Sequence, residues 1–119
     1  MERPIIQINT LYSLPNEKFL HETLRPILKG LNNHFIIILQ STLHDKNIAL
    51  FNLSDLDKKR KLIKVLNSDL LLKNSLANMV IGFFTDSELN FYLENKKEVN
   101  KRIHALIQQR ILSQIEEFE

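Results

Sequence analysis

One long helical pattern of apolar residues restricts the folds open to this chain more than any other feature. Its members recur at spacings of one, three and four residues: Phe19, Leu20, Leu24, Ile27, Leu28, Leu31, Phe35, Ile38 and Leu39. Side chains at these spacings share one face of an α-helix. Pro26 interrupts the pattern, and proline is costly inside a helix because it lacks an amide hydrogen and clashes with the preceding turn. The helix therefore either kinks at Pro26 or begins anew after a Thr23 cap; we favour a new helix over about residues 24–43.

The scarcity of turn residues extends this prediction to the rest of the chain. Only 2 glycines and 3 prolines occur among 119 residues, too few for the many turns of a β-sandwich or barrel. Further helices are expected over about residues 55–66, 69–83 and 96–118, with a short helix that ends near residue 93. The predicted fold class is all-α, a single domain over residues 1–119. An extended arm (1–15) precedes a bundle of four to five helices (16–119).

The main alternative is an α/β fold. Residues 5–8 and 35–39 are both rich in isoleucine, which favours strands, and the two segments would then be neighbouring strands.

Cap signals divide the predicted helices. Ser54 precedes a helix with acidic residues in its first turn, and either Asn67 or Ser68 is expected to start the next. Gly82 marks a helix end, and Thr85-Asp-Ser-Glu88 matches the capping box. We therefore interpret residues 81–92 as a joint between helices rather than a site. The buried edge of helix 55–66 is expected to consist of Leu56, Ile63, Leu66 and Leu70.

Several classes of chemistry lack the residues they need. The chain has no cysteine, and none of its 4 histidines has another at the three- or four-residue spacing that places two metal ligands on one helix face. It has no glycine-rich phosphate loop. The serines expected at caps or within helices are Ser41, Ser54, Ser68, Ser75, Ser87 and Ser113. We predict no catalytic residues, no metal and no cofactor. Because the longest apolar run, residues 35–39, is far short of the ~20 residues of a membrane span, we expect a cytoplasmic protein with no membrane partner.

A basic run, Lys58, Lys59, Arg60 and Lys61, is the first candidate site. As a functional feature it would contact phosphates as part of a helix-turn-helix, so nucleic acid is one candidate partner. As a structural feature it is a solvated helix face on which Asp57 pairs with Lys61 four residues later. The structural interpretation is favoured, because the helix that follows, over residues 69–83, has few side chains that could hydrogen-bond to DNA bases.

A polar cluster is the second candidate site: Tyr92, Asn95, Asn100, Lys101, Arg102 and Arg110. Glu98 is placed to pair with Arg102. Arg110 interrupts the apolar side of the last helix, and a partly buried arginine needs acidic or carbonyl partners. A structural network is favoured, and a site for an anion or a protein partner is the alternative.

Self-association is expected because Phe35, Ile36, Ile37, Ile38 and Leu39 carry more apolar surface than one bundle face can cover. We predict a homodimer in which this helix or the isoleucine-rich C-terminal helix contacts the second copy; the alternative is a monomer with this helix at its centre. The leading function is a non-enzymatic interaction or regulatory protein acting through helix surfaces. Nucleic-acid binding through residues 58–61 and a small enzyme with a pocket between helices are the alternatives.

Four segments also carry a resemblance: residues 22–29 (ETLRPILK), 73–76 (KNSL), 81–85 (IGFFT) and 100–103 (NKRI). In this order the chain resembles, over roughly residues 20–115, a group of small, uncharacterised bacterial all-helical proteins, some labelled glyoxalase. The resemblance implies a small cytoplasmic protein. It supplies no catalytic residues, because metal-dependent glyoxalases use His and Glu ligands on strands and the sequence shows neither such strands nor such ligands.

Overall fold

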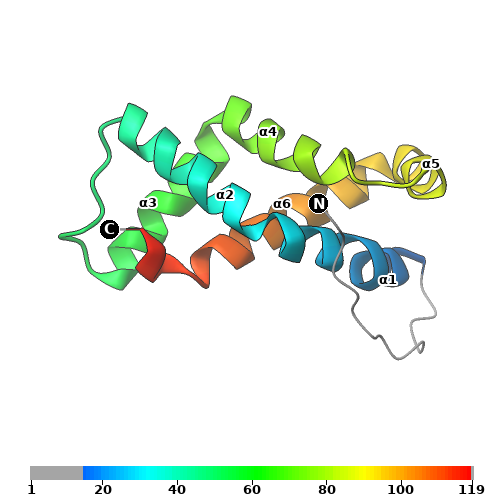
Figure 1. Cartoon of the computed structure of the whole chain (residues 1–119), viewed down its shortest axis with the longest axis horizontal. Coiled ribbons are helices and arrows are strands. Elements are labelled where there is room, and N and C mark those ends of the chain that lie inside the picture. The colour runs from blue at the N-terminus through cyan, green and yellow to red at the C-terminus, as the bar shows by residue number, and fades with distance from the viewer. Residues whose placement is uncertain (1–14, 119) are drawn as a thin grey trace.

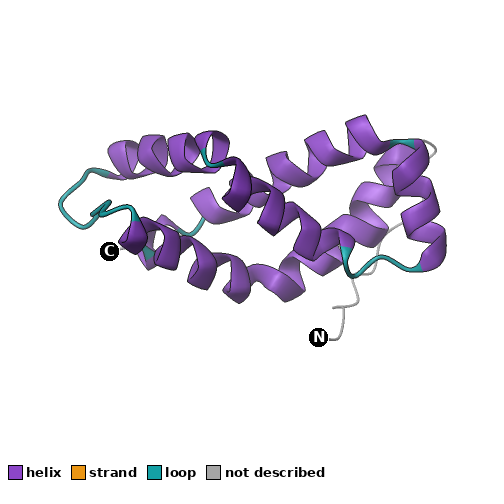
Figure 2. Cartoon of the chain, turned by 90° about the horizontal axis from the view of Figure 1, so that it is seen from above, coloured by secondary structure: helices purple, strands orange, loops and turns teal. Residues whose placement is uncertain are grey.

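The computed structural model describes residues 15–118, and all their regular structure is helical (Figures 1 and 2). The helices are α1 (Pro15–Phe19), the π-helical η1 (Leu20–Leu24), α2 (Arg25–Asp45), α3 (Asp55–Ser68), α4 (Leu70–Ile81), α5 (Asp86–Glu94), α6 (Lys96–Leu112) and the 3-10 helix η2 (Ile115–Glu117). The all-α prediction is confirmed. A strand at residues 35–39 is wrong, because these residues lie within α2. The arm and the strand proposed at residues 5–8 fall outside the described residues.

Pro26 is accommodated by a π-turn rather than by a cap. The Arg25 amide donates to the Leu20 carbonyl, five residues earlier. Leu24, at the start of α2, keeps helical dihedral angles and provides no side-chain cap. The π-turn replaces one α-helical turn before Pro26, so α1, η1 and α2 follow one another without a break. We call this continuous helix the first rod. Pro26 does lie in the first turn of α2, but the prediction that Thr23 caps a new helix is wrong.

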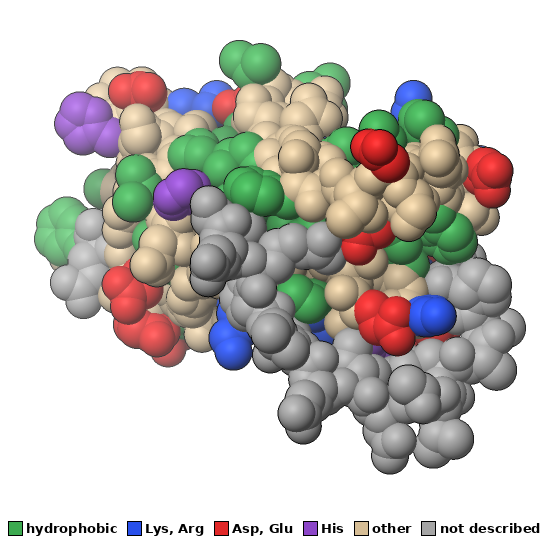
Figure 3. All heavy atoms as spheres, turned by 45° about the vertical axis from the view of Figure 1, so that its right-hand side comes forward, with side chains coloured by type: hydrophobic (Ala, Val, Ile, Leu, Met, Phe, Trp, Pro, Cys, Tyr) green, Lys and Arg blue, Asp and Glu red, His purple; other side chains and the backbone are tan. Residues whose placement is uncertain are grey.

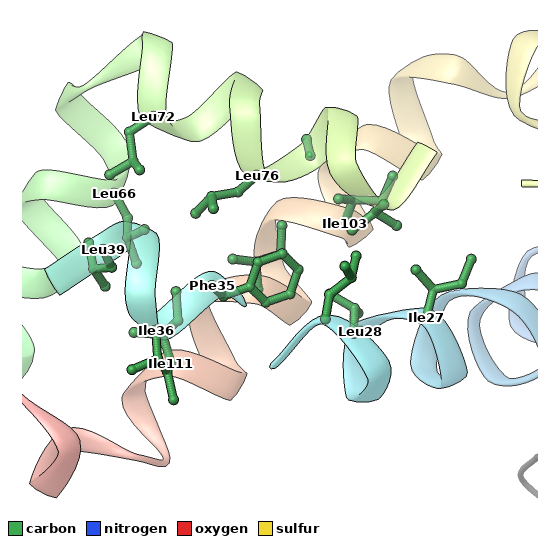
Figure 4. Close-up of a cluster of buried hydrophobic side chains, with 14 of the residues drawn as sticks. Ile27, Leu28, Phe35, Ile36, Leu39, Leu66, Leu72, Leu76, Ile103 and Ile111 are labelled. Atoms are coloured by element: carbon green, nitrogen blue, oxygen red, sulfur yellow. The ribbon is translucent and has the colours of Figure 1, made fainter. Parts of the chain in front are cut away.

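α2 is the central element of the core and packs against both α4 and α6 (Figure 1). Phe35 of α2 lies among Leu76 of α4 and Ile103 of α6 (Figure 4). The buried positions of α6 recur every four residues: Val99, Ile103, Ile107 and Ile111. This spacing gives α6 a continuous apolar face against α2 and α4.

The buried face of α3 differs from the predicted one. Leu62, Val65 and Leu66 are buried, whereas Leu56 is 59% exposed and Leu70 is 65% exposed. Leu56 lies six residues before Leu62, which places it well off the buried face at 100° per residue. Ser54 caps α3 as predicted, because its hydroxyl oxygen accepts from the Asp57 amide at 3.2 Å.

The cap between α3 and α4 is Asp69 rather than Asn67 or Ser68. The Leu72 amide donates to Asp69 Oδ1 at 3.0 Å. Ser68 belongs to the last turn of α3, where its hydroxyl donates to the Lys64 carbonyl at 2.6 Å. A carboxylate at this position also interacts favourably with the positive end of the α4 dipole.

The joint between α4 and α5 has the predicted caps. Gly82 follows the last residue of α4. The Glu88 amide donates to Thr85 Oγ1 at 3.3 Å, and the Thr85 amide donates to Glu88 Oε1 at 2.8 Å. This reciprocal pair is the predicted capping box, which satisfies two amides at the start of α5.

Aromatic rings hold the joint against the first rod. Phe19 meets Phe84 edge to face, with ring centroids 5.4 Å apart, and stacks on Phe91 at 4.7 Å. Phe84 also lies 5.8 Å from Tyr92. These contacts position α5 against α1. They are the contacts expected if residues 81–92 are a joint between helices.

The apolar residues of α2 are better covered than the sequence predicted. Phe35, Ile36 and Leu39 are buried and Ile38 is partly covered, so only Ile37, which is 62% exposed, projects outward. The expectation that this segment exposes a broad apolar surface is therefore wrong, because α4 and α6 cover α2 from two sides.

Ile37 is one of several large apolar side chains that reach the surface, and exposed apolar side chains are visible on the face in Figure 3. The exposed set is Ile37, Phe51, Leu56, Leu70, Leu71, Leu89 and Leu93. Within residues 15–118, no helix combines the length and the apolar composition that crossing a membrane requires.

Candidate functional site

The predicted polar cluster divides into two parts in the structure. In the first part, the buried Tyr92 donates its hydroxyl to Asn100 Oδ1 at 2.8 Å and so connects α5 to α6. Asn95 lies between the two helices, and its side-chain amide donates to the Phe91 carbonyl at 3.0 Å. Both contacts are local and hold the α5–α6 corner together.

Arg102 belongs to the same structural part. Its Nη2 lies 3.3 Å from Glu17 Oε1 of α1, and its Nε lies 3.4 Å from Glu98 Oε1. The predicted Glu98–Arg102 pair is confirmed. Lys101, one residue earlier, is exposed. Arg102 therefore joins α6 to the first rod, with its charge already compensated by two carboxylates.

Arg110 lies two turns farther along α6, in a different environment. Together with Arg25 of α2 it lines a cleft of about 230 Å³. Leu28 and Leu106 supply the apolar part of the wall, and the remaining lining residues are Gln109 and Ser113. The cleft thus combines two guanidinium groups with a short apolar surface.

The two arginines lack an acidic partner among the described residues. No carboxylate of residues 17–118 lies within 4.0 Å of either guanidinium group. Partial burial, followed by the positive charge of Arg25, lowers the pKa of Arg110. Both causes disfavour a cation, so the site is electrostatically uncompensated and an anion in the cleft would be attracted to it.

A pair of side-chain amides supports Arg110. The Asn32 amide donates to Gln114 Oε1 at 2.9 Å, and the Gln114 amide donates to Asn32 Oδ1 at 2.7 Å. Arg110 Nη1 donates to the same Asn32 oxygen at 3.5 Å, a long contact. Gln114 also donates to the Arg110 carbonyl at 2.9 Å. Asn32 and Gln114 thus fix the end of α6 against α2 and leave most of the Arg110 donors available.

The basic run contains an ion pair, and a short connection follows its helix. Arg60 Nη1 lies 3.8 Å from Asp57 Oδ1, and the predicted Asp57–Lys61 pair is wrong because Arg60, three residues from Asp57, takes the carboxylate. Asp69 is the only residue between α3 and α4. Helix-turn-helix motifs use a turn of about three to four residues, so the α3–α4 pair lacks that connection.

His104 lines a cavity of about 20 Å³ between α3, α4 and α6, together with Asn67, Lys73 and Gln108. Burial, and then the charge of Lys73, lowers the pKa of His104. The cavity is large enough for about one water molecule. Among the described residues, no three His, Asp or Glu side chains are grouped so that they could hold a metal ion.

Sequence reasoning named Arg110 but missed Arg25, its neighbour in the cleft. The two residues are far apart in the chain and meet only because α2 and α6 pack together. The only sequence signal for the cleft was Arg110 itself, an arginine within the apolar side of α6. No protein-family model matches the chain, and no curated protein or solved structure is significantly similar to it.

Proposed function

We propose that this is a non-enzymatic interaction protein that binds an acidic side chain of a partner protein in the Arg25–Arg110 cleft. The observation that supports the proposal is the pair of arginines without a carboxylate partner among the described residues. A guanidinium group is planar and always charged, and its donors match the two oxygens of a carboxylate. A carboxylate between Arg25 and Arg110 would offset both causes that lower the Arg110 pKa, first its partial burial and then the positive charge of Arg25.

The size and lining of the cleft favour a side chain over a larger ligand. Its volume of about 230 Å³ is below the ~300–1,000 Å³ of typical small-molecule pockets. The methylene groups of a glutamate fit against Leu28 and Leu106, and Gln109 and Ser113 offer polar contacts at the edge. Such an arrangement provides one charged anchor within a larger protein–protein contact.

Calorimetric titration tests this function with two blocked tetrapeptides, one with two central glutamates and one with two central glutamines. The acidic peptide should bind in the millimolar range and the amide peptide should not bind. Arg110→Gln should weaken the acidic peptide about tenfold, equivalent to about 1.4 kcal/mol. Lys101→Gln is the matched control, because it removes one positive charge from the exposed side of the same helix and should change the affinity less than twofold.

Two results would oppose the proposal. Equal binding of the two peptides would show that charge is not recognised. An equal loss of affinity in Arg110→Gln and Lys101→Gln would show that the acidic peptide responds to overall charge rather than to the cleft.

Self-association is a second candidate, supported by a groove between α2 and α4 of about 350 Å³. Ile38 and Leu72 line it together with Leu71, which is 80% exposed. Leu70, the preceding residue, is also exposed, and contiguous exposed apolar surface is typical of a protein contact. We therefore keep the homodimer as a proposal, with this groove in place of the broad apolar face expected on α2.

A further inference from the structure

A second concave basic surface lies at the other end of α2, separate from the arginine cleft. It has a volume of about 270 Å³ and is lined by Lys46, Ile48, Lys61, Lys64, Val65 and Ser68. Lys46 follows the last residue of α2, whereas Arg25 is its first residue. At 1.5 Å per residue the two lie about 30 Å apart along the helix. We call this surface the lysine depression.

Lys61 and Lys64 reach the lysine depression from the same side of α3. They are three residues apart, a spacing that places side chains next to each other on a helix. Neither has a carboxylate within 4.0 Å among the described residues. Asp57, the acidic residue nearest in sequence to Lys61, is engaged by Arg60 at 3.8 Å. Their ammonium groups are therefore available to a ligand.

Lys46 is held in place by an ion pair. Its Nζ lies 3.3 Å from Asp69 Oδ2, and Asp69 is itself fixed as the cap of α4 through its other oxygen. Three lysines and one carboxylate give the depression a net charge of about +2. A doubly charged phosphate monoester would neutralise it.

The groups around the depression favour phosphate over a planar carboxylate. Ser68 uses its hydroxyl hydrogen on the Lys64 carbonyl, so the side-chain donors at the site are the three ammonium groups. Ammonium groups bind phosphate as point charges and have no fork that matches a carboxylate. Ile48 and the buried Val65 add an apolar surface beside the lysines.

We propose that the lysine depression binds the phosphate group of a small phosphate ester, whose organic part lies against Ile48 and Val65. The three lysines line one concavity. Lys59 and Arg60 do not line it, and Arg60 is paired with Asp57. A single phosphate therefore fits this arrangement better than the spaced phosphates of a nucleic acid.

Phenyl phosphate and inorganic phosphate are suitable probes, followed through the backbone amide resonances of residues 46–48 and 61–68. Both should give saturable shifts in the millimolar range, and phenyl phosphate should bind at least about threefold tighter, because its ring covers apolar surface. Lys64→Gln should weaken phenyl phosphate about fivefold. Lys59→Gln, an equal charge change on an exposed part of α3, should alter its affinity less than twofold.

Three outcomes would overturn the proposal. The first is the absence of saturable shifts at residues 46–48 and 61–68. The second is an equal loss of affinity in Lys59→Gln and Lys64→Gln, which would indicate diffuse attraction. The third is duplex DNA binding that falls steeply with salt and weakens equally in Lys58→Gln, Lys59→Gln and Lys64→Gln, which would identify a nucleic-acid surface instead. The affinity read from residues 46–48 and 61–68 should be the same in Arg110→Gln, because Arg110 lies at the other end of α2 from these residues, so this test and that of the arginine cleft are independent.

Discussion

The Thr23 hydroxyl donates a hydrogen bond of 2.8 Å to Glu88 Oε2 and so joins the first rod to the cap of α5. The other oxygen of the same carboxylate accepts from the Thr85 amide at 2.8 Å. Glu88 therefore completes the capping box and at the same time anchors α5 to η1. Thr23 is buried, and this bond explains how a polar side chain is tolerated there.

Thr23→Val should lower the free energy of unfolding by about 1–2 kcal/mol, because it removes the hydroxyl and leaves Glu88 Oε2 without that donor. Thr42→Val is the matched control. Thr42 Oγ1 donates only to the Ile38 carbonyl of its own helix, so this variant should cost less than about 0.5 kcal/mol. Urea unfolding followed by circular dichroism measures both. Equal costs would show that the Thr23–Glu88 bond contributes nothing beyond a local contact.

The pair Ile36 and Ile37 tests the placement of α2. Ile36 is 9% exposed and Ile37 is 62% exposed. Ile36→Glu should cost more than about 3 kcal/mol of stability, because it buries a charge without a partner. Ile37→Glu should stay within about 0.5 kcal/mol of the parent. Chemical unfolding compares them directly, and severe destabilisation by Ile37→Glu would mean that α2 presents a different face to the core.

His104 should make stability depend on pH. Its folded-state pKa is lowered by burial and then by Lys73, so the unfolded chain binds a proton more readily than the folded one. Stability should therefore be full above the ordinary value of 6.5 and fall as the pH drops through it.

The pH effect is measured by urea unfolding at about pH 7.5 and about pH 5.5. His104→Gln should reduce the difference between the two conditions. His34→Gln, at an exposed position of α2, should retain the difference. A pH dependence that is unchanged in His104→Gln would remove the proposed role of this histidine.

The α2–α4 groove gives self-association a specific test. Light scattering at micromolar concentration should show a dimer, and Leu71→Glu should give a folded monomer because it puts a charge beside Ile38 and Leu72. Leu93→Glu, an equivalent change at an exposed position of α5, should remain dimeric. A species of 14.0 kDa at every concentration of the parent protein would exclude the dimer.

The caps were predictable from sequence because their partners are three residues away. Ser54 and the Thr85–Glu88 box are examples. The Asp57 pairing was less predictable, since Arg60 and Lys61 both lie within reach of it along the helix. At Pro26 the sequence suggested a kink or a new cap, whereas the chain forms a π-turn in which the Arg25 amide donates to the Leu20 carbonyl.

The arginine cleft could not be predicted from residues close together in the sequence. Arg110 stood out because it interrupts an apolar helix face, but Arg25 becomes its neighbour only when α2 and α6 pack. Among the other members of the predicted polar cluster, only the Arg102–Glu98 pair followed from a four-residue spacing. The Tyr92–Asn100 bond and the Arg102–Glu17 pair join different helices, so they depend on how those helices pack.

The most direct test of the account is the NMR response of the arginine side chains to the acidic tetrapeptide. The Nε–H resonances of Arg25 and Arg110 should shift together and report one dissociation constant. Those of Arg60 and Arg102, which are already paired with carboxylates, should stay in place. Shifts confined to Arg60 or Arg102, or no shift at Arg110 when the peptide is saturating, would contradict the proposal that this cleft binds an acidic partner.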